Sequence, residues 1–244
     1  MHKSRYIDIH THILPGVDDG PVHMEESISM LKMEYEQGVV AIIATPHYMA
    51  GRDNIPVDEL ELIKDRLQEE ASKIAPDLKI YLGNELLYSD SIIDDLQAKK
   101  ALTLAGSRYV LVEFLPAVEY NRLFRAVSDF VNAGYIPIIA HAERYQCLRH
   151  KKQLICDLID AGCYIQMNAS SLAGNIFNNP DALYNARLIN SGLVHFIGSD
   201  CHDTIRRKPD IIKAEKAMKK RCGDDIILRV FADNPAKILD NTYI

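Results

Sequence analysis

Short apolar runs recur along this chain, and each is followed by turn or helix signals. Seven such runs stand out, and most of them are continuous and rich in β-branched residues. Runs of this kind are typical of strands that are buried on both faces of a parallel sheet. The predicted strands span residues 6–12, 39–45, 79–82, 109–114, 135–140, 163–167 and 194–198.

Helical patterns lie between these runs. Residues 25–37 place Ile28, Leu31 and Tyr35 at helical spacing and end before Gly38, a residue suited to the position after a helix. The other predicted helices span residues 58–73, 120–132, 151–160, 181–191 and 213–221. Strand and helix alternate throughout, which indicates an α/β fold. Seven parallel strands favour a distorted (β/α)7 barrel of the TIM-like type over an open sheet.

Composition narrows the class of protein. The chain has 244 residues, of which 48% are hydrophobic and 25% are charged, as in a soluble globular protein. No internal repeat or linker interrupts it, so we expect one domain over residues 1–244. The net charge is -6 and no long basic run exists, which argues against binding to nucleic acid. The polar amino terminus and the absence of a long apolar run argue against a signal peptide and against membrane insertion.

Cysteine usage indicates the compartment. The five cysteines are an odd number and form no C-x-x-C pair. This pattern fits reduced thiols, so we expect a cytoplasmic protein.

Histidines and acidic residues stand where the predicted strands end. Barrel enzymes collect their catalytic groups at this rim. The candidates are His10, His12, His47, Glu85, Glu113, His141, Asp200 and His202. Acidic residues seldom follow a buried apolar run without a partner, and a cluster of metal ions is a common partner for so many of them. Imidazole and carboxylate ligands suit Mn, Fe or Zn.

Such a cluster points to hydrolysis of phosphate esters, with a hydroxide that bridges two ions as the attacking group. Arg144, Arg206 and Arg207 follow the predicted site residues closely, and a guanidinium matches phosphate oxygens. Residues 206–208 are equally consistent with a solvated basic turn. His195 falls inside a predicted strand, so we expect it to be packed and hydrogen-bonded and not a ligand.

The order of these motifs resembles that of the polymerase and histidinol phosphatase (PHP) superfamily. Its signature is D-x-H-x-H near the amino terminus, then a lone histidine, two glutamates, another histidine and a final D-x-H. More narrowly, the chain resembles the bacterial capsule-associated tyrosine phosphatases of the CpsB/YwqE type. The segments that carry this resemblance are residues 12–15, 18–20, 44–47, 141–144, 170–174, 199–200 and 233–235.

The resemblance implies a distorted seven-stranded barrel with two or three divalent ions, most often manganese. His10, His12, Glu85 and Asp200 would surround one ion; Glu85, Glu113 and His141 a second; Asp19, His47 and His202 a third. Asp18 could replace Asp19, since the sequence does not separate the two acids. Arg144 and Arg207 would bind the substrate phosphate. The implied partner is an autophosphorylating bacterial tyrosine kinase that controls capsular or exopolysaccharide synthesis.

Four alternatives remain open from the sequence. Histidinol-phosphate phosphatases and PHP-type exonucleases share the superfamily motifs. Cys201 and Arg207 have the C-x5-R spacing of cysteine-dependent tyrosine phosphatases, although no glycine lies between them. A metal-stabilised module that binds a kinase without turnover is the fourth. The sequence names no general acid.

Overall fold

The computed structural model describes residues 5–172 and 181–244. All seven predicted strands are present in it, with bounds that differ from the predicted ones by at most two residues. They are β1 (Tyr6–Thr11), β2 (Val39–Ala44), β4 (Lys79–Leu82), β6 (Tyr109–Glu113), β7 (Ile136–Ile139), β8 (Tyr164–Asn168) and β9 (Phe196–Gly198). The sequence did not predict two further short strands, β3 (His47–Met49) and β5 (Glu85–Leu87).

The predicted helices are present too. They are α1 (Met24–Glu36), α2 (Val57–Ile74), α4 (Tyr120–Asn132), α5 (Lys152–Asp160), α6 (Ala182–Asn190) and α7 (Ile211–Lys219). Three short helices were not foreseen: α3 (Ile92–Gln97), α8 (Asp224–Leu228) and α9 (Asn234–Leu239). Helix α4 shows why the spacing of apolar residues predicts a helix. Leu123, Val127 and Phe130 lie on one face of α4 and are buried. Gly134 follows with φ +87°, a backbone conformation that favours glycine.

All ladders between the strands are parallel, so the α/β prediction is confirmed. The strands form two sheets. One has the strand order β1-β2-β4, and the other has the order β3-β5-β6-β7-β8-β9. The break arises because β2 continues into β3, and β4 into β5, across short interruptions. Pro46 has no backbone N–H to donate at the first interruption, although its carbonyl accepts from the N–H of Glu85 at 3.1 Å. His47 and Glu85 therefore begin second strand segments, and the expectation that they directly follow the ends of β2 and β4 was wrong in this detail.

The two sheets meet next to β1 and β9, where an isolated β-bridge joins Thr11 to Cys201. The N–H of Asp200 donates to the carbonyl of His10 at 2.8 Å. Asp8 Oδ1 strengthens this seam, because it accepts from the N–H groups of His10 (3.2 Å) and Ser199 (3.0 Å). Within the described residues the strands do not form a continuous hydrogen-bonded ring.

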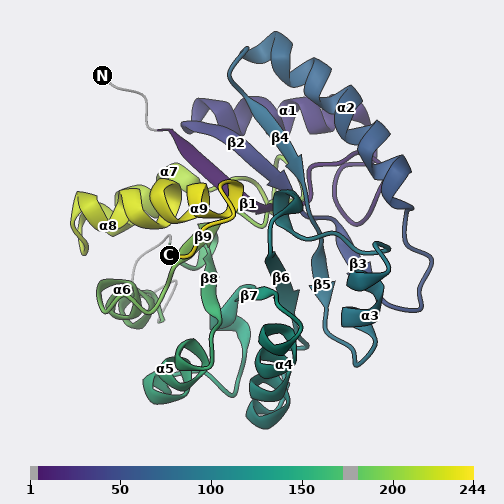
Figure 1. Cartoon of the computed structure of the whole chain (residues 1–244). Helices are drawn as coiled ribbons and strands as arrows, with labels where there is room; N and C mark the ends of the chain where they lie inside the picture. The colour runs from purple at the N-terminus through teal and green to yellow at the C-terminus, as the bar shows by residue number, and fades with distance from the viewer. Residues whose placement is uncertain (1–4, 173–180) are drawn as a thin grey trace.

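Helices pack around the outside of the strands, as Figure 1 shows. An inner apolar cluster, with Ile9, Ile43, Leu111 and Ile138 among its members, fills the space that the strands enclose. Alternation along β6 explains how the site arises from this core. Tyr109 and Leu111 belong to the inner cluster, so Glu113 follows on the same face at the rim. No helix in the described ranges is long and apolar enough to cross a membrane.

Candidate metal centre

The carboxyl ends of the strands bring histidines and acids from distant parts of the chain to one rim. Three groups of side chains there have possible ligand atoms within 4.8 Å of one another. They are His10, His12, Glu85 and Asp200; His12, Asp19, His47 and His202; and His47, Glu85 and Glu113. His12, His47 and Glu85 each belong to two groups, so the groups form one connected cluster.

The first group is fully buried. Glu85 Oε2 lies 3.2 Å from both His10 Nε2 and His12 Nε2. Asp200 Oδ1 lies 3.6 Å from the same two nitrogens, which are themselves 3.4 Å apart. Two imidazoles and two carboxylates thus surround one point, a donor set that suits Mn, Fe or Zn.

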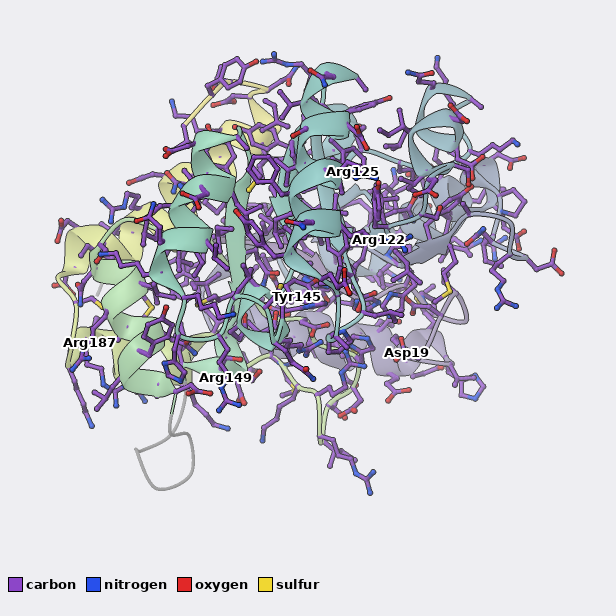
Figure 2. The ribbon with its side chains drawn as sticks, turned by 90° about the horizontal axis from the view of Figure 1, so that it is seen from below. Asp19, Arg122, Arg125, Tyr145, Arg149 and Arg187 are labelled. Atoms are coloured by element: carbon purple, nitrogen blue, oxygen red, sulfur yellow. The ribbon has the colours of Figure 1, made fainter. Side chains whose placement is uncertain are left out.

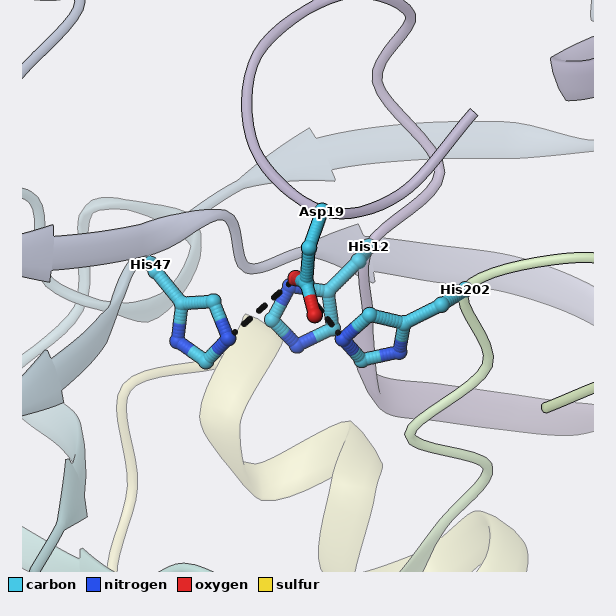
Figure 3. A group of neighbouring side chains, drawn as sticks. All are labelled: His12, Asp19, His47 and His202. Atoms are coloured by element: carbon cyan, nitrogen blue, oxygen red, sulfur yellow. Dashed lines mark ion pairs between the residues drawn. The ribbon is translucent and has the colours of Figure 1, made fainter. Parts of the chain in front are cut away.

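The second group gathers around Asp19 (Figure 3). Asp19 Oδ1 lies 3.4 Å from His47 Nε2 and 3.1 Å from His202 Nε2. The rings of His12 and His202 stack with their centroids 3.8 Å apart. His202 Nε2 and His47 Nδ1 are buried and have no hydrogen-bond partner in the part of the chain that the structure describes. Buried nitrogens without such a partner, held near carboxylates, fit ligands of a cation.

The third group adds Glu113, and His141 lies beside this group. His47 Nδ1 lies 3.1 Å from Glu85 Oε2 and 3.7 Å from Glu113 Oε2. His141 Nε2 lies 2.9 Å from Glu85 Oε1 and 3.3 Å from Glu113 Oε1. All nine residues that the resemblance implies as ligands therefore meet at this rim. That they hold ions stays a prediction.

Asp18 and Asp19 have different surroundings. The carboxylate of Asp18 is buried. Its Oδ2 lies 2.6 Å from His12 Nδ1 and accepts from the N–H of His47 at 3.1 Å. Asp18 therefore orients His12 from behind, as a carboxylate commonly does for a metal-binding histidine. Asp19 lies among the ligand atoms, so the geometry favours Asp19 as the ligand.

Three buried polar residues support the cluster, and the sequence analysis assigned none of them a role. Gln166 Oε1 lies 3.3 Å from His10 Nδ1 and accepts from the N–H of His141 at 2.7 Å. Asn168 donates to Asp200 Oδ2 at 2.6 Å. The Tyr145 hydroxyl lies 3.5 Å from His141 Nδ1. The sequence does contain a sign of this supporting role for Gln166 and Asn168, because both are polar residues within the otherwise apolar strand β8.

Two site residues have a left-handed backbone. His141 has φ +31° and Asp200 has φ +51°, values that non-glycine residues adopt rarely. Each follows the end of a strand, where this turn of the backbone redirects the chain at the rim. Residues in such conformations concentrate at functional sites, where the surrounding structure holds them in place.

The charges in the cluster influence one another. Burial alone lowers the pKa of His12, but hydrogen bonds with Asp18 and Glu85 raise it to about 10. Burial raises the pKa of Asp200, but the charge of His10 contributes to lowering it to about 2. The carboxylate of Asp200 is thus ionised at neutral pH. A divalent cation would displace the proton that His12 holds, because an imidazole binds a metal in its neutral form.

Two arginines stand at the mouth of the cluster. Arg144 Nη2 lies 2.7 Å from Asp200 Oδ2, and Arg207 Nη2 lies 3.1 Å from Asp200 Oδ1. Arg207 Nη1 also lies 3.0 Å from Asp19 Oδ2. The side chain of Arg207 is therefore held at the site and does not simply extend into solvent. The two arginine side chains remain about 40% exposed, so an incoming anion can reach them.

Cys201 faces away from the rim. Its sulfur lies 3.0 Å from Thr11 Oγ1 and 3.5 Å from Glu34 Oε1 of α1, and the residue is fully buried. Burial raises the pKa of the thiol well above its usual value. A nucleophilic cysteine needs an accessible thiolate, so the C-x5-R alternative was wrong.

Other sequence expectations can also be placed. His195 is packed and hydrogen-bonded as expected: its Nδ1 accepts from the N–H of Ile165 at 3.1 Å, and its carbonyl accepts from Asn234 at 2.8 Å. Ser171 in the segment 170–174 donates to Glu143 at 2.6 Å. Ala173 and Gly174 of that segment lie outside the described residues.

Comparison with known proteins decides the family. Residues 6–240 match the family described as "Capsular polysaccharide synthesis, CpsB/CapC". The chain belongs to the CpsB/CapC family. Tyrosine-protein phosphatase CpsB of Streptococcus agalactiae is 34% identical over 242 residues, which cover 98% of this chain and all of that protein. Tyrosine-protein phosphatase YwqE of Bacillus subtilis is 33% identical over 239 residues, covering 98% and 93%.

A solved structure agrees with this membership in the CpsB/CapC family. It comes from work on YwqE of Bacillus subtilis and CpsB of Streptococcus pneumoniae, described as metal-dependent tyrosine phosphatases. It superposes on this chain with a TM-score of 0.89 at 31% identity, covering 98% of this chain and 96% of the other. The CpsB/YwqE resemblance seen in the sequence is therefore confirmed.

Proposed function

We propose that this protein is a metal-dependent tyrosine-protein phosphatase. The observation that carries the proposal is the arrangement around Asp200. One of its carboxylate oxygens faces His10 and His12, and both oxygens contact the guanidinium groups of Arg144 and Arg207. A site for cations and a site for a phosphate group thus share one residue.

Two or three divalent ions, Mn²⁺ by preference, would be held by the nine rim residues. His10, His12, Glu85 and Asp200 would hold one; Glu85, Glu113 and His141 a second; Asp19, His47 and His202 a third. When bound, such ions supply positive charge next to the phosphate and lower the pKa of a bound water. The fit rests on the buried imidazole nitrogens and on a donor set without thiolates.

The residues of this chain have separable roles in the reaction. Arg144 and Arg207 bind the non-bridging oxygens of the phosphate through their planar N–H forks. Asp18 holds His12, and Gln166 holds His10, in one orientation. The leaving phenol has a pKa near 10, so the reaction needs little help from a protonating acid. No titratable residue is assigned that role.

The wider setting is part of the same proposal. We infer that the strands form a distorted (β/α)7 barrel, since β2 with β3 and β4 with β5 count as one strand each and Thr11 bridges Cys201. Residues 1–244 would act as one domain. The substrate would be a phosphotyrosine protein of capsular or exopolysaccharide synthesis, a tyrosine kinase being the first candidate. Free thiols at the five cysteines support a cytoplasmic location.

The decisive test is hydrolysis of a phosphotyrosine peptide by the protein as purified, after exhaustive chelation, and after Mn²⁺ is added back. We expect activity to be lost with the metal and to return with Mn²⁺. Histidinol phosphate and single-stranded DNA serve as parallel substrates. Faster hydrolysis of either one would move the function to the corresponding alternative, and binding of a phosphotyrosine protein without turnover would indicate a non-catalytic module.

A further inference from the structure

A hollow beside Glu113 is not used by the chemistry described so far. Its volume is about 240 Å³, and its lining includes Leu87, Tyr88, Phe114, Leu115, Val118 and Arg122. All of these except Arg122 present mainly apolar surface. Arg122 lies over the Tyr88 ring, with its Cζ 5.7 Å from the ring centroid.

The walls of the hollow are joined to the metal centre through the backbone. Leu87 is the direct partner of Glu113 in the ladder between β5 and β6, one strand spacing away. The N–H of Tyr88 donates to the carbonyl of Glu113 at 2.9 Å. The N–H of Phe114 donates to the hydroxyl of Tyr145, which contacts His141. These backbone contacts fix the position of the hollow relative to the proposed metal ligands.

The lining of the hollow stands at and just after the carboxyl ends of β5 and β6, which belong to the same rim as the site. Leu115, two residues after Glu113, is 68% exposed. Helix α4 begins five residues after Leu115, at Tyr120, and carries Arg122, which is labelled in Figure 2. The exposed side chain of Leu115 thus continues the apolar lining of the hollow to the surface of the molecule.

Other apolar side chains stand close to proposed site residues. Ile205, three residues after His202, is 79% exposed, and Met49, two residues after His47, is 38% exposed. A small soluble phosphate ester would use none of this surface. A phosphotyrosine in a polypeptide would, because its neighbouring residues extend over the rim once the phosphate reaches the arginines.

We propose that the hollow of Leu87, Tyr88, Phe114, Leu115 and Val118 is a subsite for an apolar side chain of the substrate polypeptide, next to its phosphotyrosine. This inference rests on the proposed function and adds the kind of sequence that the enzyme selects. The occupant is a leucine-sized or phenylalanine-sized side chain, because the residues that line the hollow offer mainly apolar contact on several sides.

The test compares two phosphotyrosine peptides of equal length and charge with the Mn²⁺-loaded protein. One carries leucine at the three positions on each side of the phosphotyrosine, and the other carries serine there. We expect kcat/KM to be at least about tenfold higher for the leucine peptide, the effect of burying one such side chain. p-Nitrophenyl phosphate, which has no flanking residues, reports the chemistry alone.

Leu115→Ser is the diagnostic variant, because its side chain is exposed and its loss should not affect folding. It should reduce the preference for the leucine peptide several-fold and leave hydrolysis of p-nitrophenyl phosphate unchanged. Leu62→Ser is the matched control, since Leu62 is 61% exposed on the outer helix α2. Leu87→Ser tests the inner wall in the same way.

The outcomes separate the two proposals. Equal rates for both peptides, or a preference that Leu115→Ser and Leu87→Ser leave intact, would overturn the subsite while the phosphatase function stands. Failure of the wild-type protein to hydrolyse either peptide or p-nitrophenyl phosphate would overturn the proposed function and the subsite with it.

Discussion

Asp18 and Asp19 are adjacent in the sequence, yet their carboxylates contact different atoms of the histidine cluster. Asp18 Oδ2 contacts His12 Nδ1 at 2.6 Å, whereas Asp19 Oδ1 lies 3.1 Å from His202 Nε2. One carboxylate orients a candidate ligand, and the other is itself a candidate ligand. The turn of backbone between them separates two roles that residue type alone does not distinguish.

Replacing each acid should separate these roles. Asp19→Asn should remove one ion per chain and reduce phosphatase activity by roughly 100-fold, because a ligand is lost. Asp18→Asn should weaken metal affinity by about 10–100-fold and recover activity at high Mn²⁺, because only the support of His12 is lost. Metal content by mass spectrometry and Mn²⁺ titrations of activity measure both effects. Asp65→Asn on α2 is the control, and the reverse pattern would assign the ligand to Asp18.

Replacing Arg144 tests the phosphate site. Arg144→Ala should lower kcat/KM for a phosphotyrosine peptide by roughly 10²–10³-fold, the usual effect of losing a donor to a developing charge. Arg144→Lys should recover little, because a lysine cannot reproduce the planar fork. Steady-state kinetics with unchanged metal content make the comparison. Arg149→Ala is the control, since Arg149 pairs with Asp181 away from the cluster; near-normal kinetics for Arg144→Ala would remove Arg144 from the site.

Replacing Cys201 separates metal chemistry from thiol chemistry. Cys201→Ser should keep kcat within about threefold of the wild type, because the buried thiol is not placed to attack a substrate. Iodoacetamide should likewise leave the folded protein active. Activity assays before and after alkylation suffice. A loss of several orders of magnitude in a folded Cys201→Ser variant would restore the cysteine-dependent mechanism.

His195 makes stability depend on pH. Burial, followed by the charge of Arg229, lowers the pKa of His195 to about 4, whereas an unfolded chain titrates near 6.5. Between these pH values the unfolded chain binds a proton that the folded protein does not. The contribution of a neutral His195 is therefore complete above about pH 6.5 and declines as the pH falls toward 4.

His195→Asn isolates this effect, because asparagine can still accept the N–H of Ile165. The unfolding free energy of the wild type minus that of the variant should fall by roughly 2–3 kcal/mol between pH 7 and pH 4. Urea unfolding of both proteins across this range measures it, and metal loss at low pH cancels in the difference. A difference that does not change with pH would mean that folded His195 takes up a proton normally.

Local patterns along the chain predict most of the helices and strands of this protein. Continuous β-branched runs and amphipathic segments located seven strands and six helices, because burial on two faces or on one face leaves different periods in the chain. The position of His10, His12, Asp200 and His202 at strand ends followed from the same runs. Parallel strands bring such ends to one rim, so the sequence alone predicts the cluster.

Other features of the site depend on how distant segments of the chain pack together. Asp18 and Asp19 differ by the path of a loop, and Gln166 contacts His10 across 156 residues of chain. The burial of the Cys201 thiol depends on the packing of α1 against it. The hollow beside Glu113 depends on the pairing of β5 with β6. Each of these features is a contact between segments that are distant in sequence. No local period records such contacts, because they are set by packing in three dimensions and not by the propensities of neighbouring residues.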